Sequence, residues 1–220
     1  MRENFKKLLL VSQSPRRRKM VSWLEISVDV TGVPIDERPF PDEHPAPLAT
    51  RLALEKSQAL DAPLSEAWIL AADTTVDLEG RSLGKPQNPA EAELMLRQLR
   101  DRPHEVHTGV ALRIPQAQET TVRRVTTRVW MRPYTDAEIA AYVASGDPMD
   151  KAGAYAIQNA AFDPVAKAAR CYANVVGLPL CAVAALMRAS GHILTVDIPA
   201  LCRRHFGYHC PRQDQGELVL

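Results

Sequence analysis

Four consecutive cationic residues lie at the start of an amphipathic stretch near the front of the chain. Residues 16–19 are Arg-Arg-Arg-Lys, and they follow Ser14 and Pro15. A serine N-cap followed by proline at the first helical position predicts that a helix begins here. Because a helix N-terminus carries unpaired N–H groups and a partial positive charge, cations placed there favour a bound anion. We therefore expect phosphate to bind at this turn, with a solvated basic turn as the alternative.

Asp73 is a second candidate, because it directly follows the apolar run 68–72. Open α/β sheets place ligand-binding groups at the ends of their strands, and Thr74 and Thr75 add hydroxyls beside this carboxylate. A carboxylate at a strand end could hold a divalent metal or orient water. The alternative is an aspartate that only ends the strand or makes a local turn bond.

Gly84-Lys85-Pro86 is a third candidate, and alone it is weak. Its glycine lets the backbone approach a ligand closely, and Lys85 could meet phosphate as a point charge. The Walker A pattern is absent because proline follows Lys85, which disfavours a P-loop kinase or ATPase.

Charged residues between these segments add acids for a metal and cations for phosphate. Asp36 and Glu37 lie in a proline-rich loop, and Lys56 lies on the second predicted helix. Arg51 and Glu55 are four residues apart on the same helix, so they could simply pair with each other.

Two later segments also hold polar groups. Gln158 follows the charged and small residues 150–155, and its amide can pair bidentately with a base edge, although a turn that leads into a strand is an equal alternative. The spacing of four residues near the C-terminus could suit zinc. Free thiols with surface histidines, or a bridge between the two cysteines, are the favoured alternatives. The four residues are Cys202, His205, His209 and Cys210.

The composition limits the partners of the protein. The chain has 220 residues, 46% hydrophobic and 24% charged, which suits one large domain or two small lobes. A formal net charge of +1 gives no long-range attraction for a nucleic acid polymer, so a small phosphorylated ligand fits better. No apolar run approaches the ~20 residues that span a bilayer, and four cysteines are too few for a disulfide-rich scaffold. We expect a cytoplasmic protein without a membrane partner.

The elements that must position these groups alternate between helix and strand. Asn88-Pro89 and Thr135-Asp136 carry helix-capping patterns, and Glu79-Gly80 is typical of a hairpin turn. Residues 104–114 and 120–131 indicate a long antiparallel pair. This mixture predicts an α/β protein with a mixed, strongly twisted sheet and flanking helices. The other predicted strands are 7–12 and 68–72, and the other predicted helices are 15–25, 47–60 and 180–189, after which the pattern decays into a tail.

Six blocks of this sequence, in order, resemble the Maf family of nucleoside triphosphate pyrophosphatases. They are LLLVSQSPRRRKMVSWL, RLALEKSQAL, ILAADTTVDLEGRSLGKP, HEVHTGVAL, YTDAEIAAYVASGDPMDKAGAYAIQ and NVVGLPL. The resemblance covers about residues 7–191, so we assign a domain to 1–191 and a tail of unknown role to 192–220. It implies two lobes around a deep cleft, as in inosine triphosphate pyrophosphatase, and often a homodimer. It also implies a hydrolase that splits a nucleoside triphosphate between its α- and β-phosphates.

The resemblance also implies roles for individual residues. Asp73 matches the family's proton acceptor, and with Glu37 it would hold a divalent cation, Mg²⁺ or Mn²⁺. The positions expected to line the triphosphate site are Ser12, Ser14, Arg17, Lys56 and Lys85. Three further positions match the dTTP/UTP branch of the family, namely Arg16, Thr74 and Gln158. The neutral amide of Gln158 can satisfy the donor–acceptor edge of uracil or thymine.

Two other functions stay open at this point. One is a pyrophosphatase of the same fold that acts on modified or non-canonical nucleotides. In this chain, Ala156 and residues 159–161 replace a stretch that is richer in glycine in the family, which could narrow or reshape the base pocket. The other is a non-catalytic nucleotide-binding regulator of cell division. Pyrophosphate release from dTTP and UTP would separate both from the favoured reading.

Overall fold

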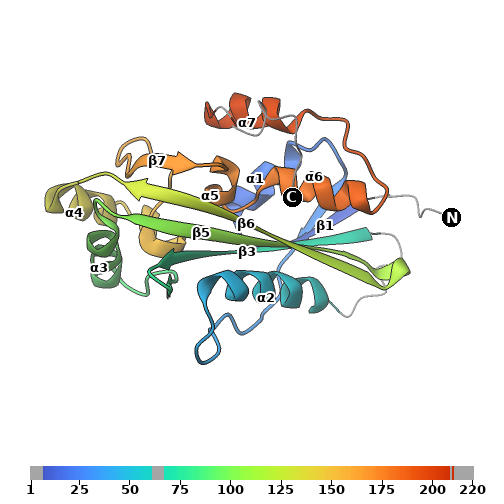
Figure 1. Cartoon of the computed structure of the whole chain (residues 1–220), viewed down its shortest axis with the longest axis horizontal. Coiled ribbons are helices and arrows are strands. Elements are labelled where there is room, and N and C mark those ends of the chain that lie inside the picture. The colour runs from blue at the N-terminus through green and yellow to red at the C-terminus, as the bar shows by residue number, and fades with distance from the viewer. Residues whose placement is uncertain (1–6, 61–66, 209, 211–220) are drawn as a thin grey trace.

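The computed structural model describes residues 7–60, 67–208 and 210, which form a mixed sheet with helices on both faces (Figure 1). The strand order is β2-β1-β3-β5-β6-β7, and β4 pairs with β3 outside that path. The strands are β1 (Lys7–Val11), β2 (Val28–Thr31), β3 (Ala67–Leu78), β4 (Arg81–Leu83), β5 (Pro103–Ile114), β6 (Glu119–Met131) and β7 (Val165–Ala169).

The helices divide between the two faces and one end of the sheet. In Figure 1, α2 covers one face, α1, α5 and α6 cover the other, and α3 and α4 lie together at one end of the long strands. The helices are α1 (Pro15–Ser22), α2 (Pro45–Gln58), α3 (Pro89–Leu99), α4 (Asp136–Ala144), α5 (Tyr172–Val176), α6 (Leu180–Ala189) and α7 (Ile198–Phe206). Short 3-10 helices are η1 (Pro115–Ala117), η2 (Asp147–Asp150) and η3 (Ala152–Ala154).

Strand direction changes across β3. This strand is parallel to β1, which is itself parallel to β2, whereas β3, β5, β6 and β7 pair antiparallel in sequence. Apolar residues on one face of β3 contribute to two different hydrophobic clusters. Leu70 packs with the cluster under α1, α5, α6 and α7, and Val76 packs with the cluster under α3 and α4. The two clusters are the cores of two lobes, and the expected fold class is confirmed.

Local sequence signals explain where several helices begin. The Asn88 side chain accepts a hydrogen bond from Glu91 N (2.9 Å), and Pro89 is the first residue of α3. Thr135 and Glu138 form a reciprocal capping box at the start of α4. These contacts satisfy backbone donors that have no partner within the helix. Both helix starts, and the antiparallel pair β5–β6, are confirmed.

The prediction that a strand ends at Asp73 is wrong. Strand β3 continues to Leu78, and Asp73 lies opposite Gly109 of β5. The reason is that the segment after Asp73 alternates between the two faces, with Val76 and Leu78 buried in the second lobe. One long strand therefore crosses from one lobe to the other.

The expectation that the pattern decays after Gly191 misses α7. The Asp197 side chain accepts a hydrogen bond from Ala200 N (3.2 Å), which caps the helix start. Ile198, Leu201 and Cys202 are buried against the first lobe. The division of the chain at residue 191 stays a prediction.

The zinc set suggested for the end of the chain is not assembled in the described residues. The His205 ring stacks on Trp23 with centroids 3.9 Å apart, so α7 uses this histidine for packing. Cys202 is buried in the core, and burial raises the pKa of its thiol to about 12. Cys202 and Cys210 are not joined by a disulfide bond, so the bridge considered as an alternative is not formed either. His209 lies outside the described residues.

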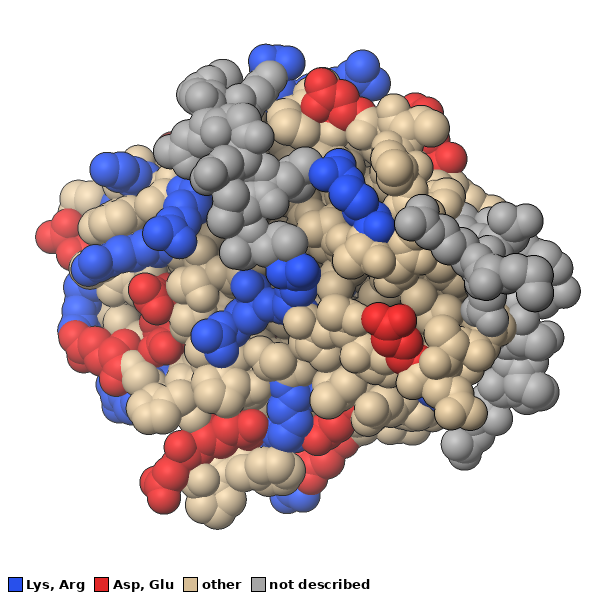
Figure 2. Space-filling model, turned by 45° about the vertical axis from the view of Figure 1, so that its right-hand side comes forward, with Lys and Arg blue, Asp and Glu red and all other residues tan. Residues whose placement is uncertain are grey.

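The surface carries both signs of charge. On the face shown in Figure 2, basic and acidic side chains are interspersed, in keeping with a net charge of +1. None of the helices in the described residues is long and apolar enough to cross a bilayer.

Candidate active site

A break in strand pairing opens a cleft beside the middle of β3. On one edge of β3, pairing with β1 stops at Ala71 and pairing with β4 starts at Val76. No described strand pairs with the 72–75 segment on that edge, and a cleft of about 580 Å³ opens there. Its lining includes every residue to which the family resemblance assigns a role. They are Ser12, Ser14, Arg16, Arg17, Glu37, Lys56, Asp73, Thr74, Lys85 and Gln158.

Lys56 joins the two carboxylates of the cleft. Its Nζ donates to Asp73 Oδ1 at 2.5 Å and forms an ion pair with Glu37 Oε1 at 2.6 Å. Asp73 is only 8% exposed, whereas Glu37 is open to solvent. Burial alone would raise the pKa of Glu37, but Lys56, with Lys85 and Arg17 nearby, holds that pKa below its usual value. Two carboxylates therefore converge on one ammonium nitrogen.

The position of Lys56 depends on a close contact between α2 and the sheet. Gly109 of β5 lies beside Asp73 in register, and a Cβ atom on Gly109 would lie 2.3 Å from Ala49 O of α2. Only a residue without a side chain allows this approach. Because α2 lies directly on the sheet, Lys56 in its last turn reaches Asp73.

Arg17 is held in place from two sides before any ligand binds. Its Nε donates to Gly177 O (2.8 Å), and its Nη2 donates to Thr74 Oγ1 (2.9 Å). Thr74 also contacts Thr108 Oγ1 at 2.9 Å. Burial lowers the pKa of Arg17, while the nearby carboxylates of Asp73 and Glu37 raise it. A buried, oriented guanidinium is well suited to binding phosphate oxygens.

The predicted helix start at the basic turn is confirmed, with Ser14 as the N-cap of α1. Ser14 Oγ accepts from Arg17 N (3.4 Å), and Ser12 Oγ accepts from Ser14 N (3.1 Å). Of the four consecutive cations, Arg16 and Arg17 line the cleft, whereas the exposed side chains at 18–19 are not part of its lining. Half of the basic turn is therefore a solvated surface.

The opposite wall of the cleft comes from the segment after α4. Arg16 Nη1 donates to Asp150 Oδ2 at 3.1 Å, and the buried Lys151 donates to Asp150 Oδ1 at 2.6 Å. Gly153 N donates to Gly84 O (3.0 Å), which ties the loop before Lys85 to this wall. Lys85 and Gln158 are exposed at the cleft, where a ligand can reach them.

Several residues of the site escaped the sequence reasoning or took another role. Sequence reasoning assigned no role to Thr108, Gly109 and Gly177. They lie in blocks that resemble the family, but their side chains offered no charged or metal-binding group. Arg51 pairs with Glu55 (3.1 Å) and with Glu43 (2.7 Å), so the simple pairing considered for it is confirmed.

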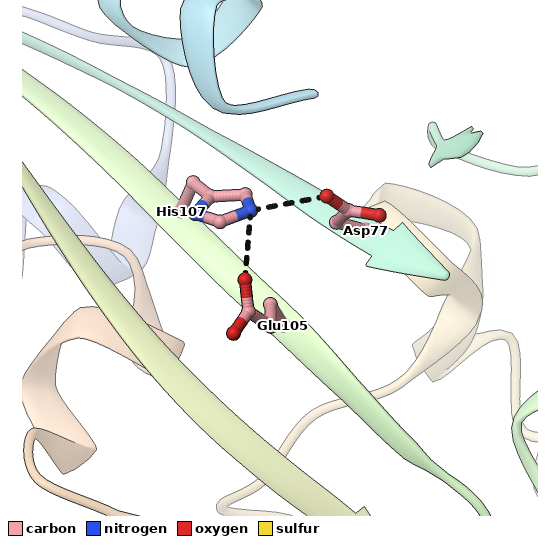
Figure 3. A group of neighbouring side chains, drawn as sticks. All are labelled: Asp77, Glu105 and His107. Atoms are coloured by element: carbon pink, nitrogen blue, oxygen red, sulfur yellow. Dashed lines mark hydrogen bonds and ion pairs between the residues drawn. The ribbon is translucent and has the colours of Figure 1, made fainter. Parts of the chain in front are cut away.

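A second group of metal-ligating side chains lies outside the cleft. Asp77, Glu105 and His107 place three potential ligand atoms within 4.8 Å of one another (Figure 3). It is the one such group of three or more found among the described residues.

Comparisons with known proteins find relatives in sequence and in structure. The dTTP/UTP pyrophosphatase of Geobacter metallireducens is 44% identical over 185 residues, which cover 84% of this chain and 96% of that protein. The dTTP/UTP pyrophosphatase of Myxococcus xanthus is 45% identical over 184 residues, covering 84% of this chain and 92% of that protein. A solved HAM1 protein from Coxiella burnetii is 16% identical, with a TM-score of 0.42 over 69% of this chain and 88% of that chain.

The family comparison covers nearly the whole described structure. Residues 7–190 match the family described as Maf-like protein, which includes both lobes and every residue of the cleft named above. The chain therefore belongs to the Maf-like family.

Proposed function

We propose that this protein hydrolyses dTTP and UTP to the nucleoside monophosphate and pyrophosphate. The observation that carries the proposal is the cleft itself, where two carboxylates share the Lys56 ammonium beside the guanidinium of Arg17. Relatives that are 44–45% identical are named dTTP/UTP pyrophosphatases. The triphosphate is a polyanion, so a pocket with fixed cations next to a buried carboxylate matches both its binding and its hydrolysis.

Asp73 and Glu37 would hold the divalent cation. Carboxylate oxygens are ligands that Mg²⁺ and Mn²⁺ prefer, and both side chains already converge on one cationic nitrogen. When bound there, the metal ion supplies positive charge that neutralises phosphate oxygens. Asp150, the other carboxylate of the described lining, accepts hydrogen bonds from both Arg16 and Lys151 instead.

The chain's own residues supply the remaining steps. Asp73 orients a water molecule toward the α-phosphorus and accepts its proton. Arg17, Lys85 and the N-terminal N–H groups of α1 bind the phosphate chain, and they stabilise the charge that develops as pyrophosphate leaves. Lys56 fixes the position of the Asp73 carboxylate.

Base selection depends on the wall around Gln158. Its amide is exposed in the cleft and offers both a donor and an acceptor to uracil or thymine. Thr74 acts indirectly, because its hydroxyl accepts the hydrogen bond of Arg17 and thereby fixes that side chain. Arg16 is held at the same wall by Asp150.

A nucleotide panel tests the proposal. Purified protein is given each common and several modified triphosphates with Mg²⁺ or Mn²⁺, and pyrophosphate release is measured. We expect the highest kcat/KM for dTTP and UTP. Tight nucleotide binding without pyrophosphate release would instead indicate a regulator, and a clear preference for modified bases would overturn the substrate assignment.

A single substitution sharpens the test of base selection. Gln158→Glu removes the amide donor and adds a negative charge beside the pyrimidine, so kcat/KM for dTTP and UTP should fall by about tenfold or more. The exposed control Gln87→Glu lies outside the cleft lining and should change neither value. An equal loss for every triphosphate would place Gln158 outside base recognition. The homodimer stays a prediction that light scattering can test.

A further inference from the structure

Asp77, Glu105 and His107 meet on the opposite side of the sheet from the second hydrophobic cluster. Figure 3 shows Asp77 extending from β3, while Glu105 and His107 extend from β5 toward the same point. His107 Nε2 lies 3.2 Å from Asp77 Oδ2 and 3.7 Å from Glu105 Oε2. All three residues lie on paired strands, with Asp77 directly opposite Glu105 in register. The sheet therefore fixes their relative positions.

The spacing of these atoms suits a metal ion. A first-row divalent cation binds nitrogen and oxygen ligands at about 2.0–2.2 Å, so neighbouring ligand atoms around it lie about 3.0–3.5 Å apart. The two observed separations are close to this range, and small rotations of the half-exposed Glu105 would complete the approach.

The histidine ring is already oriented as a ligand. His107 Nδ1 lies 2.9 Å from Thr126 Oγ1 of β6, and the imidazole side chain is only 4% exposed. A partner on one ring nitrogen fixes the direction of the other, as is usual for histidines that bind metals. Nε2 therefore points at the two carboxylates.

No Lys or Arg of the described residues forms an ion pair with either acid of this group. One Nε2–H can donate to one carboxylate at a time, but two face it. Within the described parts of the chain, His107 is the sole ion-pair partner of both Asp77 and Glu105. A cation between the three atoms would remove the repulsion between the two acids.

The geometry points to a second divalent-metal site formed by Asp77, Glu105 and His107, separate from the catalytic cleft. A site with one imidazole and two carboxylates favours Mn²⁺, Co²⁺ or Zn²⁺ over Mg²⁺, which prefers oxygen ligands alone. None of the three residues belongs to the cleft lining. Asp77 is four residues beyond Asp73 on the same face of β3, which places it about 13 Å away.

Bound metal would join β3 to β5 beside the hairpin that leads to Lys85. Asp77 Oδ1 also accepts a hydrogen bond from Gly80 N (2.7 Å) in the turn between β3 and β4. The site therefore stabilises the strand ends on which one wall of the cleft is built. Its role is structural, because it does not reach the triphosphate.

Manganese binding to the full-length chain tests this proposal. Mn²⁺ is the probe because it favours oxygen and nitrogen over thiols, and electron paramagnetic resonance distinguishes the free from the bound ion. An Asp73→Asn background removes one carboxylate of the cleft. We expect this variant, freed of metal with a chelator, to keep one tight Mn²⁺ equivalent that a large excess of Mg²⁺ does not displace.

Second substitutions in that background locate the ion. Glu105→Gln and His107→Gln should each weaken Mn²⁺ binding by at least about tenfold, and Mn²⁺ should no longer raise the melting temperature. Glu105→Gln changes a half-exposed side chain, so it guards against misfolding of the histidine variant. The matched control is Glu79→Gln, an exposed acid that pairs with Arg102, and it should bind Mn²⁺ like its parent.

Two results would overturn the proposal. One is an Asp73→Asn protein that binds no Mn²⁺, and the other is Mn²⁺ binding of unchanged affinity after Glu105→Gln. Either result would leave His107 as a neighbour of two acids without a metal ion between them. The proposed pyrophosphatase activity is measured on the wild-type protein with Mg²⁺, so its failure is a separate observation.

Discussion

Strand β3 presents two aspartates on the same face, and each shares a nitrogen with a second acid. Asp73 shares Lys56 with Glu37 inside the cleft, and Asp77 shares His107 with Glu105 outside it. The ammonium of lysine carries three N–H donors and a full charge, so it satisfies both acids. The imidazole offers a single Nε2–H, which can donate to only one of its two acids at a time.

The surroundings of the two aspartates differ as much as their partners do. Around Asp73, the cations Arg17 and Lys85 lie within the same cleft, so a polyanion can replace water there. Around Asp77, the described residues supply no Lys or Arg ion pair. Similar acids four residues apart are thus suited to different ligands, a metal–triphosphate in one place and a bare metal ion in the other.

Replacing each aspartate by asparagine should give the largest difference between the two sites. Asp73→Asn keeps the shape but removes the proton acceptor, so kcat should fall by about 10²–10⁴-fold while nucleotide binding largely survives. Asp77→Asn, assayed in Mg²⁺, should lower kcat far less because this carboxylate lies outside the cleft. Steady-state kinetics and a nucleotide-binding assay measure both. Loss of binding with a normal residual rate would argue against the role of Asp73.

Removal of the shared ammonium is the next largest change. Lys56→Met leaves the buried Asp73 without its cation, which should lower the free energy of unfolding by about 3 kcal/mol. Lys7→Met is the matched control, because its ion pair with Asp29 (2.6 Å) is exposed and should contribute less than about 1 kcal/mol. Urea denaturation measures both variants. Equal losses would mean that the cleft pair is no more than a surface contact.

A smaller effect comes from the buried histidine of β5, His104. Burial lowers the pKa of His104 to about 3, and its Nε2 contacts Tyr155 Oη at 2.8 Å. Below about pH 6.5, His104 becomes protonated in the unfolded chain but stays neutral in the folded protein. The free energy of unfolding should therefore fall by about 1.4 kcal/mol per pH unit. The loss should end near pH 3, where the folded histidine also becomes protonated.

The measurement for His104 is urea denaturation between pH 7 and pH 5. The free energy of unfolding of the His104→Gln variant should decrease less steeply with falling pH than that of the wild type, even if the variant is less stable at pH 7. Identical slopes for the two proteins would show that His104 does not govern this dependence.

The sequence was sufficient for most of the cleft, because short local signals mark its elements. Ser14 and Pro15 define the start of α1, and Thr135 defines the start of α4. The resemblance to the family then assigned residues that are far apart in the chain, such as Arg17 and Asp73, to one site. Their shared cleft is a feature of the structure, whereas their roles in hydrolysis stay a proposal.

Features that depend on pairing between strands far apart in the chain could not be predicted from the sequence. Asp73 looked like a strand end because its neighbours turn polar, but pairing with β5 continues the strand to Leu78. Asp77 and His107 are 30 residues apart, and only the register of β3 and β5 makes them neighbours. His205 lies near two cysteines in the sequence, so it resembled a zinc ligand. Nothing in the sequence indicated that its ring stacks on Trp23.

The missing side chain of Gly109 sets the height of a whole helix above the sheet. An added methyl group at Gly109 would collide with a backbone carbonyl, which cannot rotate away as a flexible side chain would. Helix α2 would have to lift, and the Lys56 ammonium at its far end would move off the carboxylate it now touches. A residue with no chemistry of its own thus determines whether the charged centre of the cleft is assembled.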